Sequence, residues 1–121
     1  MRIERGLMID SKLEQEVQLL HNHICYALSD PKRVLLLYML ADGPKRVSEL
    51  VEVLSLPQST VSRHLRVLRE RGLADTERRG TAVYYALADP RIIQALDLLR
   101  AILVSQLEAS AEWVHSLNLK D

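Results

Sequence analysis

The sequence contains 121 residues, about the length of one domain, and its 16 basic and 16 acidic side chains leave no formal net charge. Hydrophobic residues account for 48% and charged residues for 26%, which suits a globular protein and argues against wholesale disorder. No apolar run is long enough to span a membrane, and the first residues lack the apolar core of a signal peptide. We therefore expect a cytoplasmic protein, and the single cysteine, Cys25, suits a reducing compartment.

Two helices are expected in the first third of the chain. Over residues 10–28 apolar side chains recur at spacings of three and four, and Ser11 and Glu14 have the spacing of a capping box. Asp30 is placed to cap a second helix over residues 31–41. This second helix is apolar on most of its surface, which indicates that it is buried.

The middle of the chain predicts two further helices that are separated by a tight turn. Ser48 is expected to cap a short helix that ends near Leu54, and the next helix occupies residues 57–71. Gly72 suits the left-handed backbone conformation that ends many helices.

A β-hairpin is expected next, because two short extended runs follow with Gly80 between them and charged residues near the tip. In the second run Val83, Tyr85 and Leu87 alternate with other residues. A last helix then runs from Pro90 to beyond Ser110, which gives the order ααααββα. This order predicts a mainly α protein with a small β-hairpin wing, that is, a winged helix-turn-helix over residues 1–121 as a single domain.

The first and last helices carry more apolar surface than a small domain is expected to cover by itself. We expect both helices to form a homodimer interface, and the alternative is that they complete the core of a monomer. The expected interface residues are Leu13, Val17, Leu20, Ile24, Leu96, Leu99 and Leu103.

The helix over residues 57–71 is the expected DNA-reading element. Val61, Leu65 and Leu68 hold one face to the core, whereas the opposite face carries small hydroxyl residues and arginines. Gln58 can offer its amide to adenine and Arg63 its guanidinium fork to guanine. The expected contacts on this helix are Gln58, Ser59, Thr60, Ser62, Arg63 and Arg66, with Arg78 and Arg79 at the wing tip.

The basic residues are concentrated in this part of the chain. Residues 44–80 contain eight basic and five acidic side chains, a net charge of +3, so the rest of the chain carries −3. The neutral total is therefore compatible with a basic surface for nucleic acid.

Three segments together resemble the ArsR/SmtB family of bacterial winged-helix repressors over residues 13–108. They are "ALSDPKRVLLLYMLADG", "VSELVEVLSLPQSTVSRHLRVLRERGLA" and "RRGTAVYYAL". The resemblance implies a homodimer, paired through its first and last helices, that blocks promoters and releases DNA when a signal binds. It also adds His64 to the DNA-reading positions, although His64 can instead be a polar group that packs this helix. Pro57 departs from the serine that often opens the family's recognition helix.

The family's usual metal sites have no counterpart here, so we expect no metal and no cofactor. "RVSELVEVL" lacks the cysteine pair that many members carry at the third helix, and "IIQALDLLRAILVSQLEAS" lacks histidine. The remaining candidates are His21 and Cys25, which share a helix face. Cys25 is expected to be a small buried apolar residue, and the alternatives are a thiol sensor or a ligand shared across a dimer. The inducer implied by the resemblance is a small molecule, a thiol-reactive agent or a metal.

The expected partner is therefore double-stranded DNA, an operator with an inverted repeat to match a dimer. The alternative is a winged helix that contacts only proteins, against which the arginines and small hydroxyl residues of the fourth helix argue. An enzyme is not expected, because the sequence has no glycine-rich phosphate loop and no nucleophile and base in a plausible context.

Overall fold

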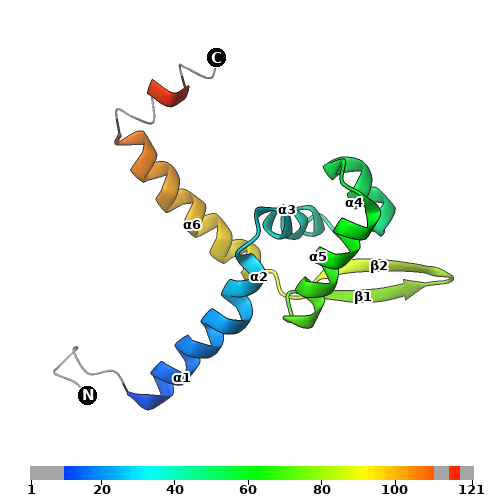
Figure 1. Ribbon diagram of the computed structural model, residues 1–121, viewed down its shortest axis with the longest axis horizontal. Helices are drawn as coiled ribbons and strands as arrows, with labels where there is room; N and C mark the ends of the chain where they lie inside the picture. Colours follow the sequence, from blue (N-terminus) through cyan, green and yellow to red (C-terminus); the bar gives the residue numbers. More distant parts are fainter. Residues whose placement is uncertain (1–9, 111–114, 118–121) are drawn as a thin grey trace. The chain divides into compact units, whose positions relative to one another are not determined.

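A computed structural model describes residues 10–110 and 115–117 of the chain (Figure 1). Its contacts divide the chain into two units, one up to Asp89 and one from Pro90 onwards. The single domain expected over residues 1–121 stays a prediction. None of the described helices is long and apolar enough to cross a membrane.

The first unit opens with a continuous helical run over residues 11–28, as the apolar spacing predicts. It comprises α1 (Ser11–Leu19), the π-helical turn η2 (Leu20–Cys25) and α2 (Tyr26–Leu28). Asp10 caps this run, since its Oδ1 accepts a hydrogen bond from the backbone N–H of Leu13 at 2.7 Å. The expected capping box that starts at Ser11 is therefore wrong: the helix begins one residue earlier than that motif requires.

Helix α3 (Pro31–Leu40) follows and forms the centre of the core. Asp30 caps it as expected, because its Oδ1 accepts a hydrogen bond from the N–H of Lys32 at 2.8 Å. The next helix, α4 (Val47–Leu54), begins after Arg46, whose N–H donates to Glu49 Oε1 at 2.8 Å. Ser48 lies inside α4, so its expected role as the cap is wrong.

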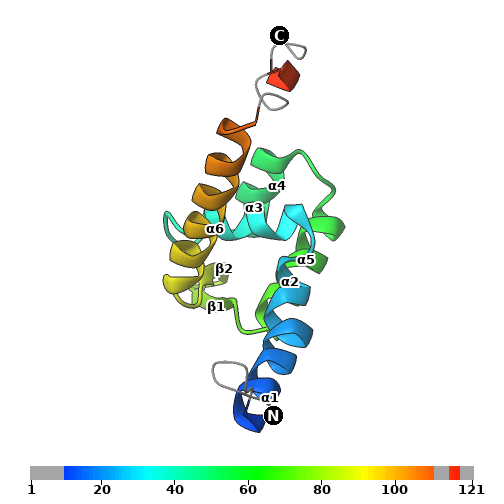
Figure 2. The ribbon, with the colours of Figure 1, turned by 90° about the vertical axis from the view of Figure 1, so that its left-hand side faces the viewer.

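Ser55 lies in the left-handed region with φ 54° and reverses the chain between α4 and α5 (Gln58–Glu70). Figures 1 and 2 show α5 beside α3 and α4, as in a helix-turn-helix. Gly72 has φ +77° and follows α5, which confirms the expected helix end.

The wing is an antiparallel hairpin of β1 (Ala74–Arg79) and β2 (Ala82–Leu87). Its register pairs Ala74 with Leu87 and Arg79 with Ala82, so a two-residue turn containing Gly80 connects the strands. The backbone of Tyr85 pairs with that of Lys45 through hydrogen bonds of 2.8 and 2.9 Å. This pairing fastens the wing to the segment between α3 and α4.

The core of the first unit lies where α3, α4, α5 and the start of β1 meet. The three expected core residues of α5, Val61, Leu65 and Leu68, are all fully buried. Each such side chain contributes about 1.5–3 kcal/mol through removal from water, so together they hold one face of α5 firmly inward. The other core residues are Ala27, Leu36, Leu37, Leu40, Leu50, Leu73 and Ala74.

The second unit is dominated by α6 (Arg91–Glu108), a single long helix (Figure 2). The helix ends at Glu108 with Ala109 as its C-terminal cap, so the expected extension beyond Ser110 is wrong. Leu96 is the buried residue of α6, whereas Leu98, Leu99, Ile102, Leu103 and Val104 are exposed.

Candidate nucleic-acid interface

One face of α5 is available to a ligand because the opposite face belongs to the core. The side chains of Gln58, Ser59, Arg63 and Arg66 are exposed, as the helical spacing predicts, and those of Thr60 and Ser62 are half-buried. Arg69, one turn after Arg66, is exposed on the same helix.

The N-terminal end of α5 adds backbone donors to this face. Its first backbone hydrogen bonds run from the N–H groups of Thr60 and Val61 to the carbonyl of Pro57, at 3.0 and 3.1 Å. The N–H groups of the first helical turn point away from the helix and coincide with the positive end of its dipole. Such a helix end suits a phosphate group.

The wing brings further basic side chains. Arg78 and Arg79 are exposed at the end of β1. Arg79 forms an ion pair with Glu77, with its Nη2 2.7 Å from Oε1, and its guanidinium lies over the Tyr84 ring at 4.7 Å from the centroid. An exposed pair of this kind is worth at most about 1 kcal/mol, so a phosphate can compete for Arg79.

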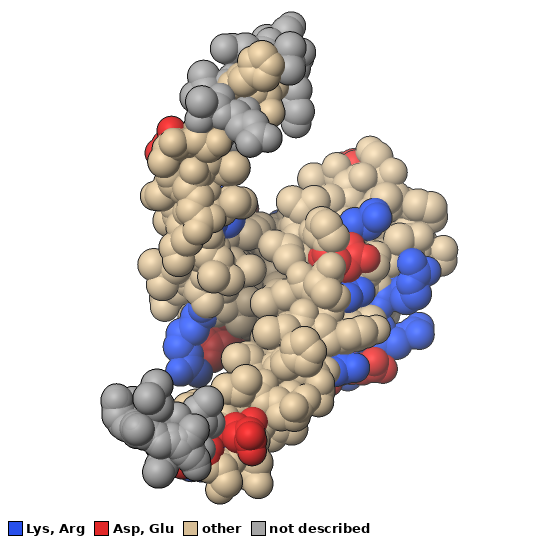
Figure 3. Space-filling model, turned by 60° about the vertical axis from the view of Figure 1, so that its left-hand side comes forward, with Lys and Arg blue, Asp and Glu red and all other residues tan. Residues whose placement is uncertain are grey.

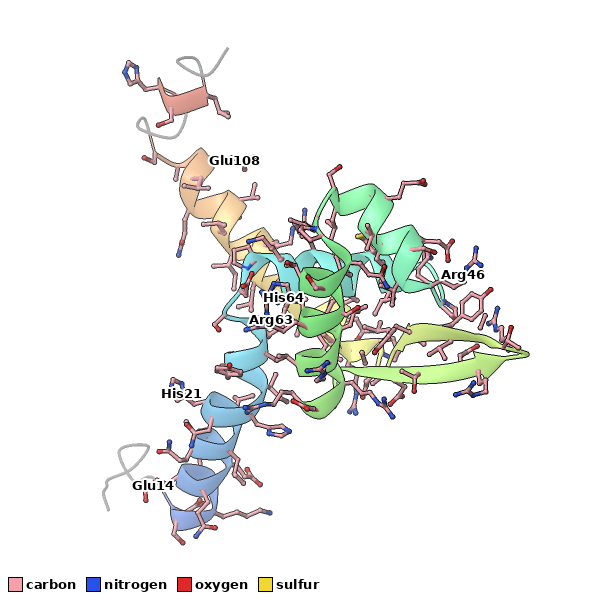
Figure 4. All side chains as sticks on the ribbon, turned by 45° about the vertical axis from the view of Figure 1, so that its right-hand side comes forward. Glu14, His21, Arg46, Arg63, His64 and Glu108 are labelled. Carbon is pink, nitrogen blue, oxygen red and sulfur yellow. The ribbon has the colours of Figure 1, made fainter. Side chains whose placement is uncertain are left out.

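His64 differs from the other expected DNA-reading residues of α5. It follows Arg63 directly on α5 (Figure 4). Only 5% of it is exposed. Its Nδ1 lies 3.3 Å from Arg33 Nη1, and its Nε2 lies 3.8 Å from Asp30 Oδ2. The burial corrects the expectation that His64 reads DNA and favours the other expected role: the imidazole packs α5 against α3 instead of facing outwards.

The surroundings of His64 keep its imidazole neutral. Burial is the main cause that lowers its pKa below the usual 6.5, the Asp30 carboxylate opposes this shift, and Arg33, Arg63 and Lys32 reinforce it. Because a guanidinium only donates, Nδ1 accepts from Arg33 and the proton resides on Nε2, on the side of Asp30.

Several basic side chains lie along the right-hand edge of the surface, with acidic side chains among them, and a smaller basic group lies at the lower left (Figure 3). This agrees with the excess of basic residues in the segment that contains α5 and the wing. The described exposed basic residues in this segment are Arg46, Arg63, Arg66, Arg69, Arg78 and Arg79.

The candidate sensing residues lie on the π-helical turn. His21 and Cys25 line a pocket of about 310 Å³ together with Asn22, Tyr26 and Ser29. Cys25 is exposed, so the expectation that it is a buried apolar residue is wrong for the isolated chain. Within the part of the chain that the structure describes, no three His, Cys, Asp or Glu side chains are grouped as a metal site would require.

The expected dimer residues fall into three groups. Leu13, Val17 and Leu20 of the N-terminal run, and Leu99 and Leu103 of α6, are exposed. Ile24 is half-buried, whereas Leu96 is buried within the single chain, so its expected place on an open interface is corrected. The structure adds the exposed residues Leu19, Leu98 and Val104, which the sequence pattern did not single out.

The exposed face of α5, the turn before it and the hairpin after it together define a winged helix-turn-helix protein. A family model described as "Bacterial regulatory protein, arsR family" matches residues 30–76, from the cap of α3 into the wing.

Similar proteins extend this match. The chain is 42% identical to the HTH-type transcriptional regulator NmtR of Mycobacterium tuberculosis over 71 residues. The match spans 59% of this chain and 59% of NmtR, so the chain covers less than two thirds of the length of that relative. The transcriptional repressor BigR from Xylella fastidiosa is 30% identical in sequence to this chain. Its crystal structure superimposes with a TM-score of 0.64, and the match covers 78% of this chain and 93% of BigR. A homodimeric winged helix-turn-helix DNA-binding domain from Mycobacterium bovis shares the fold, with a TM-score of 0.72 at 24% identity over 84% of this chain and 94% of that domain.

The chain therefore belongs to the arsR family of bacterial regulatory proteins. The family is one of transcriptional regulators, not of enzymes.

Proposed function

We propose that the protein is a sequence-specific regulator of transcription that binds double-stranded DNA as a homodimer and represses the promoter it occupies. The observation that carries this proposal is the face of α5: Gln58 and Arg63 are exposed on a helix whose other face is locked into the core. The names of its relatives, which include a transcriptional repressor, support the same function.

In this proposal α5 enters the major groove with its N-terminal turn towards the bases. Arg63 donates two hydrogen bonds to a guanine and Gln58 pairs with an adenine, while the small side chains of Ser59 and Thr60 allow close approach. Arg78 and Arg79 of the wing contact the sugar–phosphate backbone or the minor groove. These contacts distinguish the protein from a winged helix that binds only other proteins.

The homodimer is proposed from the apolar side chains that the single chain leaves in water. Leu13 and Val17 of α1 and Leu99 and Leu103 of α6 are about half exposed or more, which is costly for large aliphatic residues without a partner. The homodimeric domain from Mycobacterium bovis, which has the same fold, supports this assembly. A two-fold dimer matches an operator with an inverted repeat whose half-sites lie about 34–36 Å apart.

Substitution of Arg63 by alanine tests the proposed reading head. We expect Arg63→Ala to lose about 1–3 kcal/mol of affinity for DNA from the protein's own upstream region and to relax the preference at one base pair, because the fork to guanine is gone. Fluorescence anisotropy with labelled upstream DNA and with scrambled DNA of equal length measures both effects.

Lys12→Ala is the matched control, since Lys12 is an exposed base on α1 and lies outside the proposed DNA interface. It should bind as tightly as the parent protein. If Arg63→Ala also kept the parent's affinity and preference, the assignment of α5 as the reading helix would be wrong.

The signal that releases the DNA is proposed to act through the exposed thiol of Cys25, in the pocket that it shares with His21. Operator release and thermal stability are measured with metals, thiol oxidants and haem, in the parent and in Cys25→Ser. Release by an oxidant that is absent in Cys25→Ser supports thiol sensing. Equal release in both proteins, or no release by any of these agents, contradicts a role for Cys25.

A further inference from the structure

Arg71 differs from the other arginines of the α5 segment. Arg63, Arg66 and Arg69 are exposed, whereas Arg71, at the C-terminal cap of α5, is half-buried. Its Nη1 donates a hydrogen bond to the backbone carbonyl of Asn22 at 2.7 Å, a contact that joins residues 49 positions apart. Its guanidinium carbon also lies 4.5 Å from the centroid of the Tyr26 ring. The guanidinium of Arg71 is thus engaged by the N-terminal helical run at the partly exposed surface of the protein.

The partners of Arg71 lie in η2 and at the start of α2, which precede α3 in the chain. Asn22 belongs to η2, a π-helical turn, and single turns of this rare helix type occur frequently at functional sites. Tyr26 is the first residue of α2 and presents its ring face to the cation. The run of α1, η2 and α2 therefore contacts the end of α5 through both a backbone acceptor and an aromatic ring.

Arg33 of α3 makes a second connection between the same two segments. Its Nε donates to the carbonyl of Ala27 at 2.7 Å and its Nη2 to that of Tyr26 at 3.1 Å. Its Nη1 donates to His64 Nδ1 at 3.3 Å, in the middle of α5, and its guanidinium carbon lies 5.5 Å from the Tyr26 ring centroid. Tyr26 is therefore in contact with two guanidinium groups, one bonded to the middle of α5 and one at its end.

We propose that Tyr26, Arg33 and Arg71 form a bracket that sets the position of α5 relative to the N-terminal helical run, and that Arg71 is a positioning residue and not a DNA contact. The proposal rests on the proposed DNA-binding function. The N-terminal run also carries the exposed residues Leu13, Val17 and Leu20 of the proposed dimer interface. The bracket thus connects the surface that fixes the dimer to the helix that reads DNA.

A positioning residue and a phosphate contact differ in their response to salt. Each phosphate contact that is lost reduces the slope of log K against log salt concentration by about 1, because fewer counterions are released on binding. We expect Arg71→Ala to weaken DNA binding on the order of tenfold at every salt concentration with an unchanged slope. Arg66→Ala, which removes an exposed base from the same helix, should reduce the slope.

Variants of Tyr26 separate the bracket from a general loss of stability. Tyr26→Phe keeps the ring face and should bind DNA like the parent, whereas Tyr26→Leu removes it and should weaken binding with an unchanged slope. The losses in Tyr26→Leu and Arg71→Ala should not add in the double variant, because both remove the same contact. Urea unfolding of each variant establishes that the binding measurements refer to folded protein.

The bracket is also measurable without DNA. The side-chain protons of Arg71 should show an upfield ring-current shift in NMR spectra that persists in Tyr26→Phe and disappears in Tyr26→Leu. The absence of this shift in the parent overturns the bracket whether or not DNA binds. A parent that shows the shift but binds no DNA overturns the proposed function and leaves the contact itself intact.

For protein that binds DNA, three results overturn the positioning role. They are a salt slope that falls by about 1 in Arg71→Ala, an affinity that does not change, and losses in Arg71→Ala and Tyr26→Leu that add fully.

Discussion

Arg63 and His64 are neighbours on one helix and face opposite environments. The guanidinium of Arg63 is exposed, whereas the imidazole of His64 accepts a hydrogen bond from Arg33 inside the protein. On a helix of 3.6 residues per turn, consecutive side chains point about 100° apart, so one residue can serve the outer face while the next packs the inner one. At the residue scale, the proposed DNA contact of Arg63 and the fixation of α5 through His64 thus come from adjacent positions.

The buried His64 predicts a pH dependence of stability. Its pKa in the folded protein lies below the usual 6.5, chiefly through burial, so the unfolded chain takes up a proton first as the pH falls. Protonation of His64 therefore does not reduce stability well above pH 6.5. Stability decreases as the pH falls from 6.5 towards the lowered pKa. We expect the free energy of unfolding to fall between pH 7.5 and 5.5, with up to about 1.4 kcal/mol of this fall due to His64.

His64→Asn is the matched variant, because its amide oxygen can accept from Arg33 and does not titrate. Urea unfolding at both pH values should show a smaller fall in this variant than in the parent. The charged groups that act on the imidazole, Asp30, Lys32, Arg33 and Arg63, remain in both proteins. An equal fall in the two proteins would show that His64 is not the titrating group.

At the scale of elements, the wing combines attractive and opposing charges. Its base is fastened to the segment before α4 by the backbone pairing of Lys45 and Tyr85, so its tip has a defined place relative to α5. At the tip, Glu77 holds Arg79 by an ion pair and also brings a negative charge close to any approaching phosphate. The wing should therefore bind DNA less strongly than its two arginines alone suggest.

Glu77→Gln tests this balance at the wing. We expect the substitution to tighten DNA binding and to steepen its salt dependence, because Arg79 becomes available to a phosphate and a repulsive charge is removed. Affinity measured over a series of salt concentrations checks both effects.

Glu52→Gln, which removes an exposed acid from α4, is the control for net charge alone. If the two variants tightened binding equally, the effect would come from overall charge and not from the wing.

At the scale of the whole molecule, the chain leaves apolar side chains exposed in both of its units. In the first unit they include Leu13, Val17 and Leu20, and in the second Leu99 and Leu103. These large aliphatic residues lie on the first helical run and on the last long helix of the chain. A second copy of the same chain is the proposed cover for them. In the proposed homodimer, two reading helices would contact one operator together.

Leu99→Glu tests the dimer. Leu99 is 60% exposed, so the substitution leaves the core of the single chain intact while it places a charge in the proposed interface. We expect light scattering after size-exclusion chromatography to show a monomer, and the affinity for the operator to fall.

The matched control is Val53→Glu, since Val53 of α4 is 69% exposed and lies outside the proposed interface. This variant should remain a dimer. A dimeric Leu99→Glu protein would contradict the role of α6 in the interface.

The sequence by itself determined the order of the elements, the core-facing side of α5 and the membership in the family. Helical spacing shows which residues share a face, and Gly72 and Gly80 mark positions where the backbone needs a positive φ. The wrong expectations at Ser11 and Ser48 concern single caps, where a neighbouring residue bonds the same helix end.

Only the tertiary structure decided which neighbour covers each face. Spacing along the sequence does not reveal that Arg33 reaches His64, that Arg71 reaches Asn22 and Tyr26, or that Leu96 is buried while Leu99 is not. These contacts join residues far apart in the chain, and they arise from the packing of elements against one another. The tertiary neighbours of a basic residue thus decide whether it is available to a ligand or bonded within the protein, and Arg71 is bonded to Asn22 and lies over the Tyr26 ring.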